Sequence, residues 1–408
     1  MESRTEFSVG GIVRDWGAEY CRTHHVSTAH GRVLKALAAC RTAALGGHLE
    51  QCDDCGFERP VYNSCGNRHC PQCQGKLARR WLTRQMADLL PVPYFHVIFT
   101  LPDTLHLLVP GNERVFYGVL FQAARQALLY LAKTHLGGEP GMIAVLHTWG
   151  QKLWLHPHLH CIVTGGALSA DRRRWVSPGD RWLFDVHELS AEFRKRFCRL
   201  LRRASLRFAG ESIHLQDRAA FTAYVDGLEA RPWVVFSKKP FAGPEKVLEY
   251  ISRYTHRVAI ANRRILDVTA DGKVHFTYKD YSDKSHGDQP PEKPTELSVA
   301  EFIRRFLLHV LPAGFRKIRF AGFLGGPERS AKLASCRALL PAPAAPQAGA
   351  AATAESADPD PLQCPCCGKG TMRRTVPLPA GQALPMLTSQ PREPAPIGTG
   401  PPETRHAR

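Results

Sequence analysis

The chain has 408 residues, of which 44% are hydrophobic, which is enough for a buried core in about two to three domains and excludes a disordered protein. Its 54 Lys and Arg outnumber its 37 Asp and Glu and give a formal net charge of +17. This excess favours a polyanionic partner, nucleic acid first, although a solvated basic surface would give the same count.

The N-terminus and the longest apolar stretch predict neither a signal peptide nor a membrane span. No apolar segment follows residues 1–6. Residues 115–136 are interrupted by Gln122, Arg125 and Lys133, so they indicate a packed amphipathic helix. We therefore expect a cytoplasmic protein without a membrane partner. In that reducing compartment, its 13 cysteines favour metal binding over disulfides.

The first part of the chain is predicted to be a helical lead-in at residues 11–45, followed by a zinc module. Two Cys-x-x-Cys pairs, Cys52/Cys55 and Cys70/Cys73, are separated by fourteen residues. Each pair turns the chain so that both sulfurs face inward, and the spacing predicts one zinc ion on these four cysteines. Nearby cations suit phosphate contacts, but a purely structural zinc site fits the spacing equally well. The spare donors near these pairs are Cys65, His69 and His48, and one of them could replace a knuckle cysteine or help to hold a second ion.

The next elements predict an α+β domain built on an antiparallel sheet with flanking helices. A basic helix at about 75–90 is broken by Pro91, and a buried strand follows at 94–100. A long helix (about 112–136), a strand (142–149), a turn (150–152) and a histidine-bearing strand come after it. This order of strand, helix and hairpin is typical of the α+β class.

The histidine-bearing strand is the first candidate catalytic element. His158 and His160 flank an apolar residue, so a strand places both imidazoles on one face of the sheet. The third ligand of a metal site could be His147, on the strand paired with them, or His156, two residues earlier on the same face. A polar sheet face without an ion would have the same spacing.

The second candidate catalytic element is a helix that we expect to begin at Pro244. It follows a predicted helix at 185–209 and a strand at 233–236. Tyr250 and Tyr254 lie four residues apart and so share one helix face, from which either phenol could attack a phosphodiester. The alternative is a half-buried aromatic pair without a catalytic role.

The remaining chain is expected to contain a hairpin, a helix, a linker and a tail. Two strands at 265–268 and 274–279 are joined by a turn, and a helix follows at 297–310. An Ala/Pro-rich linker then leads to Cys364-Pro-Cys-Cys367, a knuckle without an evident second half, which His406 or a second subunit could complete. The expected divisions are 1–92 (zinc-binding), 93–265 (catalytic), 266–336 (accessory), 337–363 (linker) and 364–408 (knuckle and tail).

Several motifs in this order resemble one family. They are CRTAALGGHLEQCDDCG, YNSCGNRHCPQCQ, LPVPYFHVIFTLP, HPHLH, WVVFSKKPF, YISRYTHRVAIANRRI and EFIRRFLLHVLPAGF. Over about residues 10–325 the chain resembles rolling-circle insertion-sequence transposases of the two-tyrosine, His-hydrophobic-His class, which are related in chemistry to Helitrons and plasmid relaxases.

The resemblance implies a zinc-binding N-terminal domain and a catalytic domain whose antiparallel sheet is like that of replication initiators. It implies Mg²⁺ or Mn²⁺ dependence and cleavage of single-stranded DNA at the ends of the element. His158 and His160 match the metal pair, Tyr250 and Tyr254 match the nucleophiles, and the four knuckle cysteines match the zinc motif. The third metal ligand and the oligomeric state are left open.

Two alternatives remain at this stage. A plasmid relaxase or replication initiator would use the same chemistry on a different DNA element. A non-catalytic, zinc-dependent DNA-binding protein would share the zinc module and the basic charge but would not cleave.

Overall fold

The computed structural model describes residues 7–86, 88–179, 184–238, 258–283, 290–341 and 362–382. The chain divides into two units. The larger contains residues within Met1–Ala38 and Gly66–Ala345, and the smaller contains residues within Ala39–Cys65 and Pro346–Arg408. Both mix helices or turns with antiparallel sheets, which confirms the predicted α+β class.

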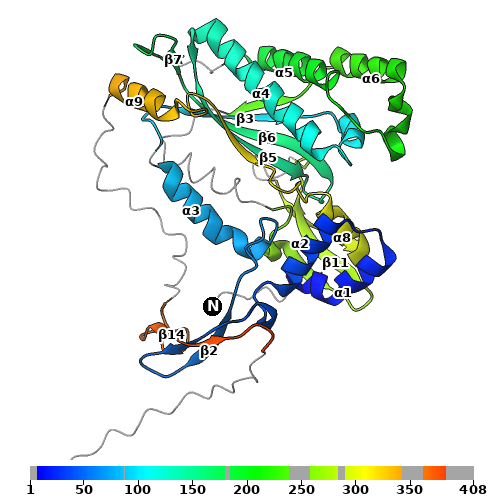
Figure 1. The fold of residues 1–408 in the computed structure, drawn as a ribbon, viewed down its shortest axis with the longest axis vertical. Coiled ribbons are helices and arrows are strands. Elements are labelled where there is room, and N and C mark those ends of the chain that lie inside the picture. The colour runs from blue at the N-terminus through cyan, green and yellow to red at the C-terminus, as the bar shows by residue number, and fades with distance from the viewer. Residues whose placement is uncertain are drawn as a thin grey trace, which may run out of the picture. The chain divides into compact units, whose positions relative to one another are not determined.

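A five-stranded antiparallel sheet forms the centre of the larger unit (Figure 1). Its strands are arranged in the order β13-β5-β6-β3-β9. Their bounds are β3 (Tyr94–Thr100), β5 (Gly141–Trp149), β6 (Leu155–Thr164), β9 (Val235–Lys238) and β13 (Ile318–Gly322). The three inner strands, β5, β6 and β3, are paired on both sides, so their backbone hydrogen bonds are satisfied without solvent.

Helices cover one face of this sheet (Figure 1). They are α4 (Glu113–Leu136), α5 (Val186–Leu201) and α6 (Arg218–Ala230). Alternate strand residues, such as Phe99, Leu146 and Leu159, pack with these helices in the main hydrophobic core. Because strand side chains alternate, the residues between them, including His96, His147 and His160, point to the opposite face. The helix-covered face therefore fixes which side chains the other face presents.

Helix α4 is the one helix in the described ranges whose length and composition would allow it to cross a membrane. Most of its apolar window, 61%, is buried inside the protein, however. Core helices of folded proteins pass the same test, and α4 contributes Phe116, Leu120 and Leu128 to the main core. The helix ends at Gly137, which adopts the left-handed conformation of a C-terminal cap.

A second sheet in the larger unit has the order β10-β11-β12. Its strands are β10 (Ile265–Val268), β11 (Lys273–Lys279) and β12 (Glu292–Ser298), and it packs against α8 (Val299–Leu307). The N-terminal helices are α1 (Val9–Thr23) and α2 (Thr28–Ala39), and α1 contacts α8. The remaining helices and strands of this unit are α3 (Gln74–Met86), β4 (Gly138–Glu139), β7 (Ala167–Ser169), β8 (Trp175–Val176) and α9 (Arg329–Leu339).

The smaller unit is built on the three-stranded sheet β14-β1-β2. Its strands are β1 (Gly47–Cys52), β2 (Glu58–Tyr62) and β14 (Met372–Leu378). Strand β14 lies antiparallel to β1, so segments more than 300 residues apart form one sheet. The expected knuckle and tail at 364–408 thus contribute to a sheet with the N-terminal knuckle, where the sequence indicated no partner.

The structure differs from the expected boundaries in four further ways. The helix predicted at 185–209 ends at Leu201, and α6 follows it unpredicted. β13 lies within the expected accessory region (266–336), but it pairs with β5 in the central sheet. α9 extends beyond position 336, where the linker was expected to begin. The N-terminal helices belong to the larger unit, not with the first cysteine pair. The pairing of β13 with β5 joins segments that are far apart in the chain, so no local periodicity signals it.

A substitution at Gly322, at the end of β13, tests how closely β13 packs beside the start of β5. Its φ of +61° lies in the left-handed region, and an added Cβ would collide with the carbonyl oxygen of Pro140. We expect Gly322→Ala to lower the free energy of unfolding by about 1–3 kcal/mol or more, measured by urea denaturation. Gly227→Ala is the matched control, because position 227 is exposed on α6 and a Cβ there meets nothing within 4 Å. This substitution should raise the free energy of unfolding by about 1 kcal/mol. Equal effects of the two substitutions would contradict this account.

Candidate active site

Three histidines converge on the face of the central sheet opposite α4 and α5. His158 and His160 lie on β6, and His147 on β5 is paired directly with His158 in the strand register. One ring nitrogen from each lies within 4.8 Å of the others. His147 is 3% exposed and His160 is 9% exposed, so the group is largely shielded from solvent. Strand alternation and register together produce this arrangement.

Hydrogen bonds orient the two β6 imidazoles. Nδ1 of His158 donates to the carbonyl oxygen of His156 at 2.7 Å, which leaves the lone pair on Nε2. Nδ1 of His160 lies 2.9 Å from Nε2 of His96, a fully buried histidine on β3. The Nε2 atoms of His158 and His160 are then 3.1 Å apart. Two ligand atoms at right angles on an ion, each about 2.1 Å from it, would be about 3.0 Å apart, so the pair fits a divalent cation.

The protonation state of the site also suits metal binding. Burial lowers the pKa of His158 to about 4, and the hydrogen bond to His156 only partly opposes this effect. His158 is therefore neutral at neutral pH, and neutral imidazole is the form that coordinates a metal. The contact between His96 Nε2 and His160 Nδ1 orients the ring of His160, as the hydrogen-bond partners of metal-ligating histidines commonly do. The sequence interpretation did not include His96, whose role depends on the pairing of β3 with β6.

His156, the other candidate for third ligand, belongs to a different group. Its ring lies with Asp103 and His106, and its Nδ1 is 3.8 Å from Asp103 Oδ1. Burial lowers the pKa of His106 and of His156, and the negative charge of Asp103 only partly opposes this effect. Asp103 is 88% exposed, so this group is more open than the His147 group. The geometry thus favours His147 as the third member of the site.

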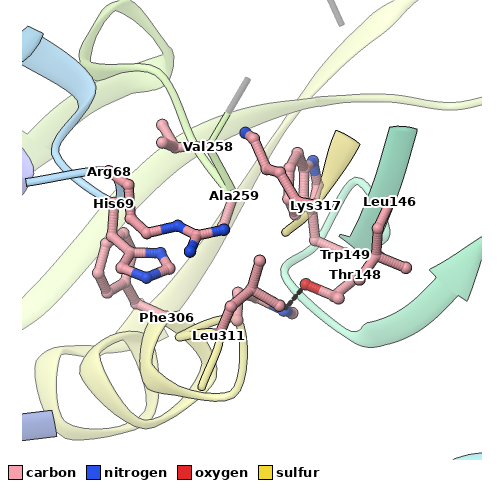
Figure 2. Close-up of a pocket in the computed structure, with 11 residues that line it drawn as sticks. Arg68, His69, Leu146, Thr148, Trp149, Val258, Ala259, Phe306, Leu311 and Lys317 are labelled. Carbon is pink, nitrogen blue, oxygen red and sulfur yellow. Dashed lines mark hydrogen bonds between the residues drawn. The ribbon is translucent and has the colours of Figure 1, made fainter. Parts of the chain in front are cut away.

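The predicted nucleophiles Tyr250 and Tyr254 lie outside the described residues, as does the start of their helix at Pro244. The described chain resumes at Val258. Val258 and Ala259 line a cavity of about 20 Å³, large enough for about one water molecule (Figure 2).

This small cavity joins three of the segments that carried the resemblance. Arg68 and His69 come from the second cysteine segment, and Val258 and Ala259 come from the tyrosine segment. His309 comes from the segment at 301–315, which begins within α8. Burial lowers the pKa of His69 to about 3 and that of His309 to about 4, so both are neutral at neutral pH. A cavity of this size is a packing junction and cannot admit a nucleotide.

A larger groove of about 460 Å³ begins at Trp149. Trp149 stacks on His147 with ring centroids 4.7 Å apart, which connects the groove to the histidine group. The exposed part of the groove is cationic and aromatic. It includes Arg263, Lys279 and Tyr281, of which Tyr281 is 64% exposed. Cations together with an exposed aromatic ring are typical of surfaces that bind single-stranded nucleic acid.

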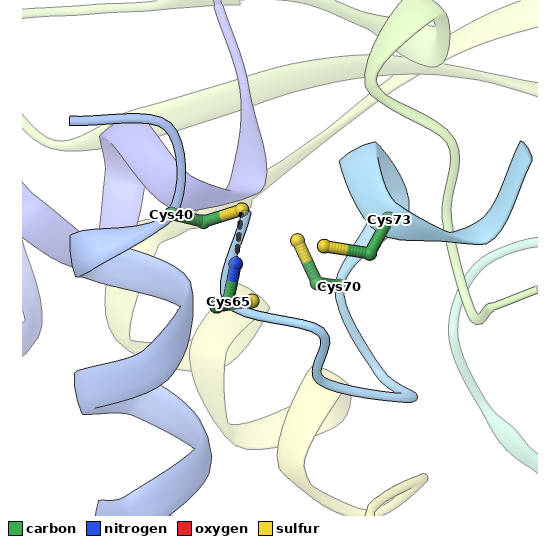
Figure 3. A group of neighbouring side chains, drawn as sticks. All are labelled: Cys40, Cys65, Cys70 and Cys73. Carbon is green, nitrogen blue, oxygen red and sulfur yellow. Dashed lines mark hydrogen bonds between the residues drawn. The ribbon is translucent and has the colours of Figure 1, made fainter. Parts of the chain in front are cut away.

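The cysteines form two groups that differ from the predicted one. Cys40, Cys65, Cys70 and Cys73 have sulfur atoms within 4.8 Å of one another (Figure 3). The backbone N–H of Cys65 donates to Cys40 Sγ at 3.5 Å.

The other cysteine pair predicted for the same ion has different neighbours. Cys52 and Cys55 group with Cys364 and Cys367. The expectation of one site on Cys52, Cys55, Cys70 and Cys73 is thus corrected, because the two pairs belong to different groups and each group is completed by two other cysteines. Cys40, which is not part of any Cys-x-x-Cys pair, belongs to the first group.

The spare histidines belong to neither cysteine group. His48 contacts Glu50 at 3.2 Å, and His69 lines the cavity of Figure 2. Cys65, the third spare donor, does belong to the first group. Cys40 has no neighbouring cysteine and so carries no local signal. The Cys364/Cys367 knuckle is visible in the sequence, but nothing local indicates that its partner is Cys52 and Cys55.

Comparison with known proteins agrees with these features. A family model described as "Transposase zinc-binding domain" matches residues 12–101, and one described as "Putative transposase" matches residues 141–332. The first range contains the Cys40 group, and the second contains all three site histidines. No solved structure matches the chain.

Two relatives extend the match over most of the chain. "Putative transposase y4qJ" of Sinorhizobium fredii is 46% identical over 384 residues, which are 91% of this chain and 95% of the relative. "Transposase for insertion sequence element IS801" of Pseudomonas savastanoi pv. phaseolicola is 30% identical over 303 residues, 71% of this chain and 68% of the relative. The zinc-binding domain, the transposase domain and these relatives together establish that the chain belongs to the IS91/IS801 family of insertion-sequence transposases.

Proposed function

We propose that this transposase cleaves and rejoins single-stranded DNA at the ends of its insertion sequence through 5′-phosphotyrosine intermediates. The observation that carries the proposal is the convergence of His147, His158 and His160 on one shielded sheet face. Family membership supports DNA as the substrate, and the insertion-sequence relative favours an element end over a plasmid origin. Because the substrate is DNA, we expect the protein to act in the cytoplasm.

The histidine group would hold the catalytic Mg²⁺ or Mn²⁺. A divalent ion bound there would offset the negative charge of the scissile phosphate that otherwise repels a nucleophile. The Nδ1 hydrogen bond of His158 and the His96 contact of His160 would keep the Nε2 atoms of these two imidazoles directed at one point. The set is preorganised, so little reorientation is needed on binding.

Tyr250 and Tyr254 are the proposed nucleophiles. Attack by a phenolate on the phosphorus forms a tyrosine–phosphate bond to the 5′ end and releases the 3′-hydroxyl of the other strand segment. That hydroxyl or another one can reverse the step, so strands are joined without hydrolysis. Two tyrosines on one helix face would allow two strand ends to be held in succession.

The groove beside Trp149 is the proposed path of the single strand. Its rings can stack on bases of any sequence, and its cations can contact phosphates. Zinc is the proposed structural metal of the zinc-binding domain, where Cys40, Cys65, Cys70 and Cys73 offer the four-thiolate donor set that zinc prefers.

The nucleophile assignment is tested by a covalent-adduct assay. Purified protein with Mn²⁺ and a single-stranded oligonucleotide from the element end should give a protein–DNA adduct that survives denaturing electrophoresis. The double substitution Tyr250→Phe/Tyr254→Phe should abolish it, and each single substitution should report which phenol acts first.

Tyr130→Phe is the matched control for that assay, since Tyr130 is half-exposed on α4 and should leave the adduct unchanged. An adduct in the double variant would refute the tyrosine assignment. DNA binding without an adduct from the wild-type protein would point instead to a non-catalytic DNA-binding protein.

The metal assignment is tested by comparing two neighbouring histidines. We expect His147→Ala to weaken Mn²⁺ binding by at least about tenfold in calorimetric titration, because it removes one of three ligands. His156→Ala should change the affinity little, since the ring of His156 groups with Asp103 and His106. The reverse ranking would assign the third ligand to His156.

A further inference from the structure

The smaller unit contains a four-cysteine group assembled from the two ends of the chain. Cys52 and Cys55 lie at the turn between β1 and β2, whereas Cys364 and Cys367 lie just before β14. β14 pairs with β1, and Cys52 stands opposite Met372 in the register. The transposase zinc-binding match at residues 12–101 contains the first two of these cysteines and not the other two.

The distances between the sulfurs match those of a tetrahedral zinc site. Cys52 Sγ lies 3.8 Å from Cys367 Sγ, and Cys55 Sγ lies 3.6 Å from Cys364 Sγ. All four sulfurs lie within 4.8 Å of one another, and all are free thiols. Four thiolates about 2.3 Å from a zinc ion would be about 3.8 Å apart. A disulfide would require about 2.05 Å, so the geometry is that of a shared cation.

Backbone N–H groups point at the sulfurs from both halves of the site. Cys52 Sγ accepts from Asp54 N at 3.4 Å and Cys55 N at 3.5 Å. In the other half, Cys364 Sγ accepts from Cys366 N at 3.4 Å and Cys367 Sγ accepts from Gly370 N at 3.3 Å. Such donors stabilise the negative charge of metal-bound thiolates. Each Cys-x-x-Cys turn therefore has the backbone arrangement of a zinc knuckle.

The two halves dock against each other closely. Asp53 accepts from Thr371 N at 2.7 Å and from Arg373 Nε at 3.0 Å. A Cβ on Gly370 would collide with Cys52 Sγ, so the second turn approaches the first at a point that only glycine allows. The two turns are thus specific partners.

The smaller unit has too small a hydrophobic core to be stable without a further link, such as a bound metal ion. Among the described residues of this unit, the hydrophobic cluster of buried side chains consists of Cys52, Cys364 and Met372, with Phe57 among the partly buried residues packed against it. Most of β14 is exposed. A core this small rarely sustains an independent fold, and small domains of this kind are commonly held by a metal.

We propose that Cys52, Cys55, Cys364 and Cys367 bind a structural zinc ion, separate from the cysteine group of Figure 3, that joins the N-terminal and C-terminal parts of the transposase into one zinc ribbon. The proposal does not depend on the tyrosine chemistry. It makes the C-terminal knuckle a required part of the fold of β1 and β2, since the first knuckle alone offers two of four ligands.

The zinc content of the full-length protein tests this site. By elemental mass spectrometry, Cys364→Ser/Cys367→Ser should contain one zinc equivalent per chain less than the wild type. Cys366→Ser is the matched control, because Cys366 lies in the same turn but is exposed and outside the group. Equal zinc content in the wild type and the double variant would overturn the proposal.

A second measurement uses only the wild-type protein and so does not depend on how the variants fold. Cysteine alkylation is mapped by peptide mass spectrometry before and after zinc is removed with a chelator. Cys366 should react in both states, whereas Cys55 and Cys367, which are partly accessible, should react only after zinc is released. Reaction of Cys55 and Cys367 at the rate of Cys366 before chelation, or no change after it, would overturn the proposal.

Discussion

The alternation of side chains across one antiparallel sheet is the constraint on which the catalytic part of this transposase depends. Apolar residues of β3, β5 and β6 are buried under α4 and α5, so the residues between them must face the other way. A shift of one residue in the register of β6 would move His158 and His160 into the core. The packing of the helices therefore also determines which face of the sheet carries the proposed metal site.

The same constraint fixes the positions of the site histidines relative to one another. His147 is brought to His158 by direct strand pairing, and His96 is brought beside His160 by the next strand. None of these residues lies on a loop. Sites carried by paired strands hold their geometry more precisely than sites on loops, which suits a metal that must be aligned with a phosphate.

Local sequence patterns predicted the parts of the fold that depend on local physics. The strand at 94–100 and the long helix ending near Leu136 agree with the structure, because each has its own periodicity and its own breaker residues. The His158 and His160 pair follows from period-two alternation alone. Choosing between His147 and His156 required the hairpin register, which the turn at 150–152 only suggested.

Features made by distant segments could not be read from the sequence. β14 has five exposed residues out of seven and resembles a polar tail until it pairs with β1. Cys70 and Cys73 have the same spacing as Cys52 and Cys55, so two pairs near each other in sequence suggested one ion. In the structure, Cys364 and Cys367 take the place that spacing assigned to Cys70 and Cys73. Ligand spacing identifies a knuckle, but it does not identify the knuckle's partner.

The central claim is that the three histidines on β5 and β6 form the catalytic metal site. Anomalous diffraction from crystals of the full-length protein soaked in a manganese salt tests it most directly. The account predicts one anomalous peak within coordination distance, about 2–2.5 Å, of a ring nitrogen from each of His147, His158 and His160. A peak between Asp103, His106 and His156 instead, or no peak near His158 and His160, would contradict it.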